Sequence, residues 1–388
     1  MDARARIAHD AADALAARLS APDRPGALVG FDGFIDAIIR VVDQRTDMSP
    51  SGYVPIGSIA AFADRCRDAA GKSTNLELVV TEERFGGNGP LMAGALGRLG
   101  APTTFIGAVG REDDPRSIHP LYAELQARCE RVIPLVPPAH TDALEFGDGK
   151  IMLGKPASVQ SITWASLVER VGLDELRAIA ARASLIGVVN WVMMGGVESI
   201  WEGLATDVLP HLPPAPHTPR RLYIDLCDPA KRTDADLARA LAMLRRLDAL
   251  APLTLGLNLA EALRVSRVAG CPKPRANDPT LQSLIAPLRE RLGLSCVVVH
   301  PRHGAAAATR DGACAWFDGP FTHSPRLSTG AGDHFNAGFA LAQVCGLSLE
   351  HCLCVGVGVS GAYVRDAQSP TLERLVAILR DLPPPEQS

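Results

Sequence analysis

Short, continuous apolar runs alternate along the chain with longer segments whose apolar residues recur at helical spacing. The runs predict strands at Ala27–Phe31, Thr103–Val109, Leu185–Trp191, Leu222–Leu226, Leu253–Asn258 and Cys296–His300. The segments between them predict helices, among them Pro90–Leu99, Asp234–Leu250, Leu259–Val268 and Thr280–Leu292. Strands that are apolar along their whole length are typical of a parallel sheet buried on both faces. The pattern therefore predicts an α/β fold, a doubly wound sheet with helices on both sides.

A second kind of strand pattern is present near the front of the chain. Ile35–Asp43 and Leu76–Phe85 alternate apolar and polar residues, as strands of a half-exposed sheet do. Thr141–Met152 predicts a hairpin, because Phe146–Lys150 places a glycine-bearing turn between apolar flanks. These segments predict a second, smaller sheet.

A long connection, Gln44–Asn75, separates the first two of these strands. It contains a loop punctuated by Pro and Gly and a predicted helix near Ser58–Ala70. Two interpretations stay open. The connection shapes a binding pocket or an oligomer contact, or it is a peripheral addition.

The composition is that of an ordinary globular protein. Of the 388 residues 47% are hydrophobic, and the formal net charge is −4. Basic residues are interspersed with acidic ones and form no stripe, so nucleic acid is not expected as a partner. The first twenty residues include Asp2, Asp10 and Asp13 and lack the uninterrupted apolar stretch of a secretory signal, so we expect an amphipathic surface helix there. No run approaches the ~20 apolar residues that span a bilayer. We expect a cytoplasmic protein with no membrane partner.

The nine cysteines lie at irregular intervals, without a Cys-x-x-Cys pair. An odd number cannot be fully paired within one chain, so free, buried thiols are expected. His351–Cys354 contains one His and two Cys, but it lies in an apolar helical stretch without a second ligand cluster. We interpret these cysteines as core residues rather than metal ligands.

The segment Ser328–Asp333 carries the clearest chemical signal. Gly330 and Gly332 allow backbone conformations that other residues avoid, so successive N–H groups can converge on an anion at the start of a helix. Asp333 follows directly, in the first turn of that helix. This order of groups is suited to phosphoryl transfer, with Asp333 as the proton acceptor. The alternative is a tight turn with an acidic helix cap.

Three other segments place polar groups where predicted strands end. Asn258-Leu259-Ala260-Glu261 begins a helix after one strand, and ligands bind at that edge of open α/β sheets. A reciprocal capping pair is the alternative for Asn258 and Glu261. Gly30–Asp36 follows another strand and contains two carboxylates, Asp32 and Asp36, which are candidates for ligand binding. The alternative interpretation is that both are exposed turn residues. Phe85–Gly89 contains two adjacent glycines before Asn88, which supplies both a donor and an acceptor.

The order and spacing of Phe85–Gly89, Asn258–Glu261 and Thr329–Asp333 resemble the ribokinase, or PfkB, family of carbohydrate kinases. The resemblance runs from about Leu28 to about Leu379. It implies a ribokinase-like three-layer α/β/α sandwich with a small β-sheet lid, and a single catalytic domain over residues 1–388. The lid would comprise residues of about 35–85, with 141–153 as a further candidate. The implied activity is transfer of the γ-phosphoryl group of ATP, with Mg²⁺, to a hydroxyl of a sugar, nucleoside or related small polyol.

The resemblance also implies roles for individual residues. Asp333 would be the base, and the amides of Gly330, Ala331 and Gly332 would bind the anion. The acceptor would be held by Asp36, assisted by Asp32, and by Gly86, Gly87 and Asn88. Asn258 and Glu261 would organise the ATP phosphates and, through water, Mg²⁺, with Glu261 as the metal-associated residue.

The chain departs from the family pattern at several positions. Leu91 stands where a further Asn is common, and Leu327 where an Asp is usual. His300–Gly304 stands where the family has a Thr-x-Gly. Arg302, Gly304 and His300 are therefore candidate nucleotide contacts. The alternative for Arg302 and His300 is a role at the surface. Asp225–Arg232 follows a further strand, at the same edge of the predicted sheet. Its basic residues either bind phosphates or belong to a solvated loop.

Two other functions stay open from the sequence. One is an ADP-dependent sugar kinase, which shares the fold and a Gly-x-Gly-Asp core. The other is a catalytically silent sugar or nucleotide sensor, which the departures at Leu91 and Leu327 would suit. A homodimer formed through an exposed lid sheet is a further expectation.

Overall fold

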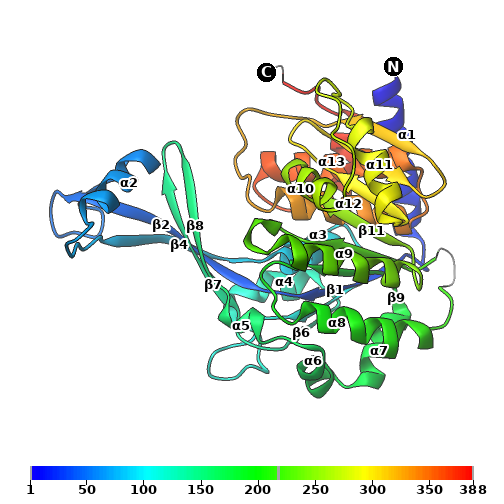
Figure 1. Ribbon diagram of the computed structural model, residues 1–388, viewed down its shortest axis with the longest axis horizontal. Coiled ribbons are helices and arrows are strands. Elements are labelled where there is room, and N and C mark those ends of the chain that lie inside the picture. The colour runs from blue at the N-terminus through cyan, green and yellow to red at the C-terminus, as the bar shows by residue number, and fades with distance from the viewer. Residues whose placement is uncertain (1, 216–218, 387–388) are drawn as a thin grey trace.

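The computed structural model describes residues 2–215 and 219–386 and contains two sheets (Figure 1). The larger has nine strands in the order β14-β13-β12-β11-β10-β9-β1-β5-β6. Its pairings are parallel from β12 to β6, and β13 and β14 extend it antiparallel. The strands are β1 (Gly26–Phe31), β5 (Thr103–Gly107), β6 (Arg131–Pro134), β9 (Ala183–Val189), β10 (Arg221–Asp225), β11 (Leu253–Leu257), β12 (Cys296–Val299), β13 (Gly304–Thr309) and β14 (Cys314–Asp318). The six predicted strands are confirmed.

Helices cover both faces of this sheet, as predicted. One face carries α1 (Ala3–Ser20), α3 (Asn88–Arg98), α12 (Ala331–Val344), α13 (Leu349–Asp366) and α14 (Leu372–Arg380). The other carries α7 (Leu173–Arg182), α8 (Val197–Gly203), α9 (Asp234–Asp248), α10 (Leu259–Val268) and α11 (Gln282–Leu292). Successive strand residues point to opposite faces of the sheet. Val29 of β1 therefore packs in the hydrophobic core on the side of α12, and Leu28 in the core on the side of α9. Further helices are α4 (Ala123–Arg128), α5 (Ala157–Gln160) and α6 (Trp164–Val171).

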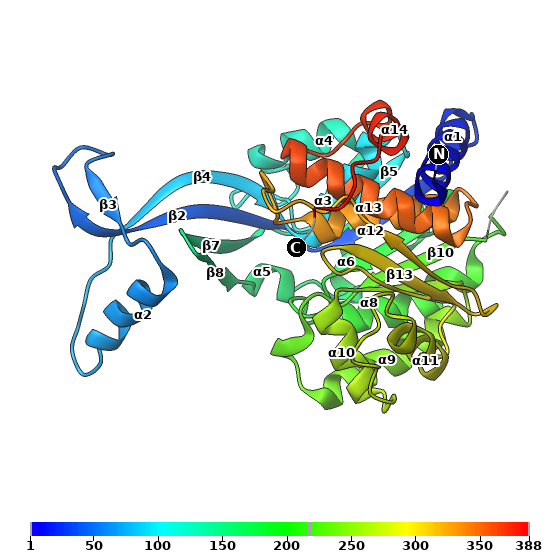
Figure 2. The ribbon, with the colours of Figure 1, turned by 90° about the horizontal axis from the view of Figure 1, so that it is seen from above.

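The second sheet projects from the body as a long arm (Figure 2). It contains β2 (Phe34–Arg45), β3 (Tyr53–Pro55), β4 (Leu78–Gly86), β7 (Ala139–Phe146) and β8 (Gly149–Lys155). β2 lies at its centre, pairing antiparallel with β4 and parallel with β7. The predicted strands and the hairpin are therefore confirmed, and β3 was not predicted.

The connection between β2 and β4 covers part of one face of this arm. Its helix α2 (Ile59–Asp68) begins after Ser58, whose side chain accepts a hydrogen bond from the amide of Ala61, as expected of an N-cap. The Phe62 ring lies 5.4 Å from that of Phe146, between centroids, in a small apolar cluster of the arm. The helix therefore gives the thin sheet a core of its own.

Three strands of the large sheet were not predicted, namely β6, β13 and β14. β13 contains the run Ala305–Ala308, and alanine favours helices. In the fold this run pairs with β12 on one side and β14 on the other, and it is fully buried. Cross-strand pairing and burial outweigh the local preference, because propensity differences are small compared with tertiary packing.

The N-terminal helix α1 is amphipathic, as predicted, and buries Ala8, Ala11, Ala12, Leu15 and Leu19 against α13 and α14. The cysteines of His351–Cys354 lie buried in α13, which confirms their place in the core. Within the described ranges, every helix is too short or too polar to cross a bilayer.

Candidate functional site

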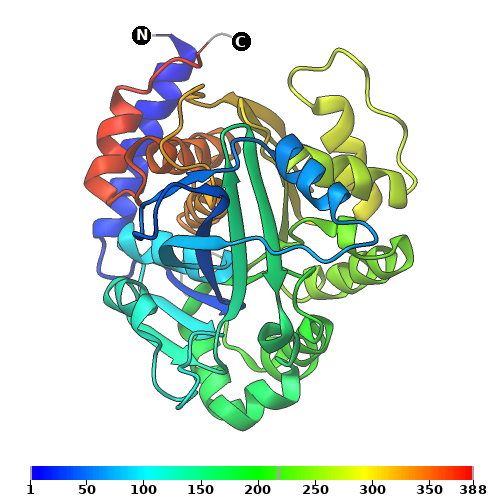
Figure 3. The same cartoon turned by 90° about the vertical axis from the view of Figure 1, so that its left-hand side faces the viewer.

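Polar groups from five neighbouring strands meet at one edge of the large sheet. Asp32 follows β1, Asn190 follows β9, Asp225 ends β10, Asn258 follows β11 and His300 follows β12. Because the carboxyl ends of parallel strands lie at the same edge, these groups face one region. The arm lies in front of this region when the molecule is viewed along it (Figure 3).

The glycine-rich turn lies at this edge, before α12. Gly330 is its N-cap and has φ of +88°, a left-handed conformation that strains other residues. A Cβ at Gly330 would lie 2.9 Å from Cδ1 of Leu91, so the unexpected leucine packs on the turn. The amide of Ala331 donates to the carbonyl of Ser328 at 3.2 Å. Within the part of the chain that the structure describes, the amides of Gly330 and Gly332 donate to no protein acceptor.

Asp333 lies in the first turn of α12 with only 6% of its surface exposed. Its Oδ1 accepts a hydrogen bond of 2.8 Å from Nδ2 of Asn88, at the start of α3. Burial raises the pKa of Asp333 well above its ordinary value, and the charge of Asp225 raises it further. Two motifs separated by more than half the chain thus form a direct contact.

Asp32 is fully buried, and its carboxylate is shared by three donors. The amides of Asn88 and Gly89 donate to it at 3.0 and 2.7 Å, and Nδ2 of Asn190 at 2.7 Å. Burial raises its pKa to about 6 against the effect of these hydrogen bonds. The alternative interpretation of Asp32 as an exposed turn residue is therefore wrong. It caps α3 and ties that helix to the end of β9.

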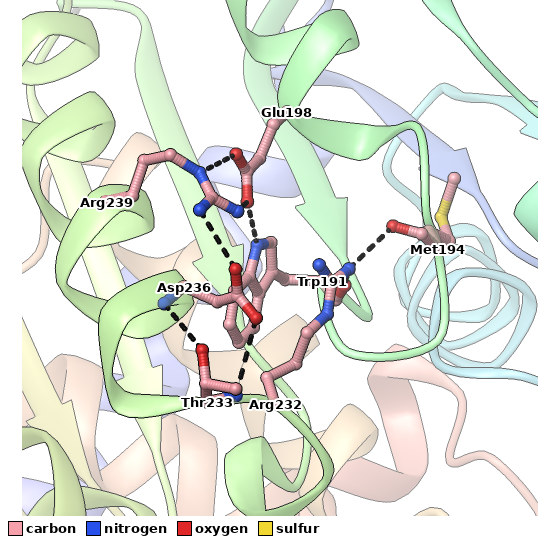
Figure 4. A network of polar contacts seen from close by, with 7 residues as sticks. All are labelled: Trp191, Met194, Glu198, Arg232, Thr233, Asp236 and Arg239. Atoms are coloured by element: carbon pink, nitrogen blue, oxygen red, sulfur yellow. Dashed lines mark hydrogen bonds and ion pairs between the residues drawn. The ribbon is translucent and has the colours of Figure 1, made fainter.

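The segment that follows β9 is held by a polar network (Figure 4). The guanidinium of Arg232 lies 4.4 Å from the centre of the Trp191 ring and donates to the Trp191 carbonyl at 2.8 Å. Trp191 Nε1 donates to Glu198, which also binds Arg239. Arg232 is therefore engaged in the protein rather than presented to phosphates. The network holds Trp191, which directly follows Asn190, a residue with φ of +67°.

Asp36 lies on β2 and is largely buried, opposite Arg84 of β4 and Thr141 of β7. Burial raises its pKa, while Arg84, the Thr141 hydrogen bond and Lys150 lower it. A Cβ at Gly86 would lie 2.3 Å from an oxygen of this carboxylate. A larger residue there would displace the Asp36 carboxylate, so the glycine pair lets the backbone lie directly against Asp36.

Lys150, at the start of β8, donates to the hydroxyl of Thr329 in the glycine-rich turn. The arm is thereby joined to the turn that precedes α12, close to Asp333 in the first turn of that helix. Arg84 and Lys150 were not predicted from the sequence. Isolated cations on strands carry no motif, and only the register of β4, β2, β7 and β8 shows that both act on Asp36.

Asn258 and Glu261 form a reciprocal capping box at the start of α10, so the alternative interpretation as a capping pair is confirmed. Glu261 is nonetheless buried, and its pKa is raised to about 8 by burial and by the charge of Asp225. Nδ2 of Asn336 donates to Asp225 at 2.6 Å. Among the described residues no group of three or more His, Cys, Asp or Glu is arranged to hold a metal.

A cavity of about 290 Å³ opens beside the turn. Its lining includes His300 and Gly332 and the apolar residues Phe321, Val357 and Val364. Arg302 and Gly304 also line it, as predicted for the nucleotide contacts. Arg302 is exposed at its edge, whereas Gly304 is buried. The His300 ring stacks on Phe335 at 4.7 Å between centroids, and burial lowers its pKa to about 4.

Comparisons with known proteins agree on one family. Residues 2–382 match the family model of prokaryotic ketohexokinases. A ketohexokinase from Haloferax volcanii is 33% identical over 365 residues, 93% of each chain. A phosphofructokinase-2 variant from Escherichia coli has a similar structure, with a TM-score of 0.62 at 14% identity, covering 92% of this chain and 98% of the other. Ribokinase from Arabidopsis thaliana, complexed with ribose and ATP, has a TM-score of 0.56 at 17% identity, with the same coverage. The resemblance to ribokinase-like carbohydrate kinases and the predicted fold are confirmed.

The contacts of Asp32 lead to a prediction about stability. In Asp32→Ala, two amides of α3 and the Asn190 side chain lose their acceptor, and unpaired buried donors cost about 1–3 kcal/mol each. We expect the free energy of unfolding to fall by about 2–5 kcal/mol, measured by urea denaturation. Asp113→Ala is the control, because Asp113 is exposed and we expect a change of no more than about 0.5 kcal/mol. Equal stability of the two variants would contradict the structural role of Asp32.

Proposed function

The chain belongs to the prokaryotic ketohexokinase family and is a carbohydrate kinase, and we propose that it transfers the γ-phosphoryl group of ATP to a hydroxyl of a ketohexose. The observation that carries the proposal is the position of Asp333. Its carboxylate contacts Asn88 of the glycine-pair segment and lies beside a turn with two amides that donate to no acceptor among the described residues. A hydroxyl placed between these groups would face both a base and an anion-binding turn.

Asp333 acts as the base in this proposal. The acceptor hydroxyl gives its proton to the carboxylate as its oxygen attacks the γ-phosphorus, and the bond from phosphorus to the β-phosphate oxygen breaks. The raised pKa of Asp333 makes its carboxylate a stronger base than an ordinary aspartate. The amides of Gly330 and Gly332 stabilise the charge on the transferred group. The amide of Ala331 serves mainly to close the turn, since it already donates to Ser328.

The acceptor is held between the arm and the large sheet. Asp36 accepts hydrogen bonds from sugar hydroxyls, Gly86 and Gly87 allow the sugar to approach the backbone, and Asn88 donates to it. Asp32 assists by holding Asn88 in place. In this proposal residues 1–388 form a single catalytic domain, and residues 35–85 and 141–153 form the lid that covers the acceptor and excludes water.

ATP occupies the cavity beside the turn, with its base among the apolar residues and its phosphates toward Gly332. Gly304 gives the cavity its shape, and Arg302 contacts the nucleotide at the edge. The site also fits Mg²⁺, because Asp225 and Glu261 are crowded carboxylates whose repulsion a cation would relieve, and hard oxygens suit this ion. Glu261 and Asn258 would hold it through water. Bound Mg²⁺ supplies positive charge to the phosphate oxygens.

A phosphorylation screen tests the proposal. Ketohexoses, aldohexoses, nucleosides and polyols are offered with either ATP or ADP and Mg²⁺, and the phosphorylated product is identified by mass spectrometry. We expect a ketohexose with ATP to give the highest kcat/KM. Preference for ADP would identify an ADP-dependent kinase, and preference for a nucleoside would contradict the proposed acceptor.

Replacement of Asp333 tests the base. In Asp333→Asn the side chain keeps its size but cannot take the proton, so we expect kcat to fall about 10²–10⁴-fold with sugar binding largely kept. For the unchanged protein, kcat/KM should decline as the pH falls through the raised pKa of Asp333, because the protonated form is not a base. Steady-state kinetics from acidic to neutral pH measure both. Unchanged activity of Asp333→Asn would remove Asp333 from this role.

Replacement of Lys150 tests closure of the lid. Lys150 brings a positive charge to the glycine-rich turn, so we expect Lys150→Met to lower kcat by about 10²-fold. Removal of one hydrogen-bond donor from an oxyanion hole has an effect of this size. Lys155→Met is the matched control. Lys155 is exposed on the same strand and pairs with Asp142, and its loss should change kcat less than about 3-fold. Equal effects of the two substitutions would contradict this role of Lys150.

We propose that a second copy of the chain packs on the exposed side of the arm that β3 and β4 form. Val54, Leu78 and Val80 expose about half of their surfaces on β3 and β4, and β4 pairs with β2 alone among the described strands. We expect a dimer in light scattering after size exclusion, and Val80→Glu should shift it to the monomer. Met48→Glu, at an exposed position of the same arm, is the control. A monomeric unchanged protein would contradict the dimer.

A further inference from the structure

The residue after Asp333 is a histidine that the proposed reaction does not use. His334 is completely buried, and both of its ring nitrogens have partners. Nδ1 lies 2.7 Å from the carbonyl oxygen of Gly330, and Nε2 lies 2.8 Å from the hydroxyl of Ser369. The ring stacks on Tyr363 at 3.6 Å between centroids, with 15° between the planes. Both ring nitrogens of this buried side chain are thus satisfied, and one of the two hydrogen bonds ends on the glycine-rich turn.

The partners of His334 determine which nitrogen carries the proton. A carbonyl oxygen can only accept, so Nδ1 must donate to Gly330. Arg128 donates to the Ser369 hydroxyl oxygen at 3.2 Å, which leaves the hydroxyl hydrogen of Ser369 for Nε2. Burial lowers the pKa of His334 to about 4, so the ring is neutral at physiological pH. Arg128 and Ser369 thus select the tautomer that binds the glycine-rich turn.

Tyr363 makes a parallel contact one residue earlier. Its hydroxyl donates to the carbonyl of Thr329 at 2.8 Å. In a trans peptide the carbonyl and the following N–H point in opposite directions. Fixing the Thr329 carbonyl therefore directs the amide of Gly330 away from α13, and fixing the Gly330 carbonyl directs the amide of Ala331 toward Ser328. The two side chains together determine the orientation of consecutive peptide groups.

We propose that His334 and Tyr363 form a carbonyl clamp that fixes the glycine-rich turn. Tyr363 directs the Gly330 amide toward the transferred phosphoryl group, and His334 keeps the Ala331 amide on Ser328, which closes the turn. Both are positioning residues, because they contact the turn from the side of α12 and α13. The inference rests on the proposed function, in which this turn binds phosphate. The Gly330 carbonyl also accepts the backbone amide of His334 at 3.1 Å, the first hydrogen bond of α12, so the side-chain Nδ1 adds a second restraint on a residue whose left-handed conformation glycine alone adopts readily.

Substitutions that retain or lose the Nδ1 donor test the clamp. In His334→Asn the side-chain amide can place a donor near the position of Nδ1, whereas the longer side chain of His334→Gln places it near Nε2, toward Ser369. His334→Leu has no donor. We expect kcat to fall about 10²-fold in the Leu and Gln variants and less than about 10-fold in the Asn variant, with KM for the ketohexose nearly unchanged. Equal losses in all three, or losses that follow the melting temperature, would overturn the clamp.

Tyr363→Phe provides a second variant in case the histidine variants do not fold. It keeps the stacked ring and removes only the hydroxyl, so kcat should fall about 10-fold without a large change in melting temperature. Activity equal to that of the unchanged protein would overturn the contribution of Tyr363.

Calorimetric binding of ATP without acceptor separates this inference from the proposed function. His334→Leu should weaken ATP binding about 10-fold, and His334→Asn should retain it. A protein that binds ATP with this pattern but phosphorylates no ketohexose would contradict the proposed function and support the clamp. An active ketohexokinase whose variants all bind and turn over ATP alike would contradict the clamp alone.

Discussion

The buried carboxylate of Asp32 is the interaction on which the site depends. It accepts hydrogen bonds from the first amides of α3 and from Asn190, and so joins the ends of β1 and β9 to the start of a helix. The position of α3 places Asn88 against Asp333 and Leu91 against the glycine-rich turn. A carboxylate is well suited to this task, because it accepts several donors at once and an N-terminal helix end favours negative charge.

The same edge of the sheet concentrates acidic groups whose pKa values are all raised. Asp32, Asp225, Glu261 and Asp333 are buried, and the charge of Asp225 contributes to the raised pKa of the other three. A raised pKa in the folded chain means that ionisation of these groups near neutral pH lowers the stability of the fold. The hydrogen bonds from Asn88, Asn190 and Asn336 offset part of this cost. Such a concentration of unfavourable charge is typical of a functional site, where a bound cation or proton transfer makes use of it.

The arm connects to this site through a small number of polar contacts. Its sheet brings Asp36, Arg84 and Lys150 together from three different strands, and Lys150 reaches Thr329 in the turn. The helix α2 covers part of one face of the same sheet. A sheet that projects from the body and carries binding residues needs such support, because a sheet is stable by itself only when it packs a hydrophobic face.

The sequence by itself determined the α/β class, the strand order along the chain and the residues Asp333, Gly330, Asn88 and Asp36 as candidates. Periodicity and glycine placement are local properties, so they can be read along the chain. The run Ala305–Ala308 was not recognised as a strand, because its pairing partners and its burial are contributed by distant segments. The positions of Lys150, Arg84, His334 and Tyr363 beside the site were likewise decided only by the tertiary structure. Their relation to Asp36 and to the glycine-rich turn depends on strand register and helix packing, which no local pattern encodes.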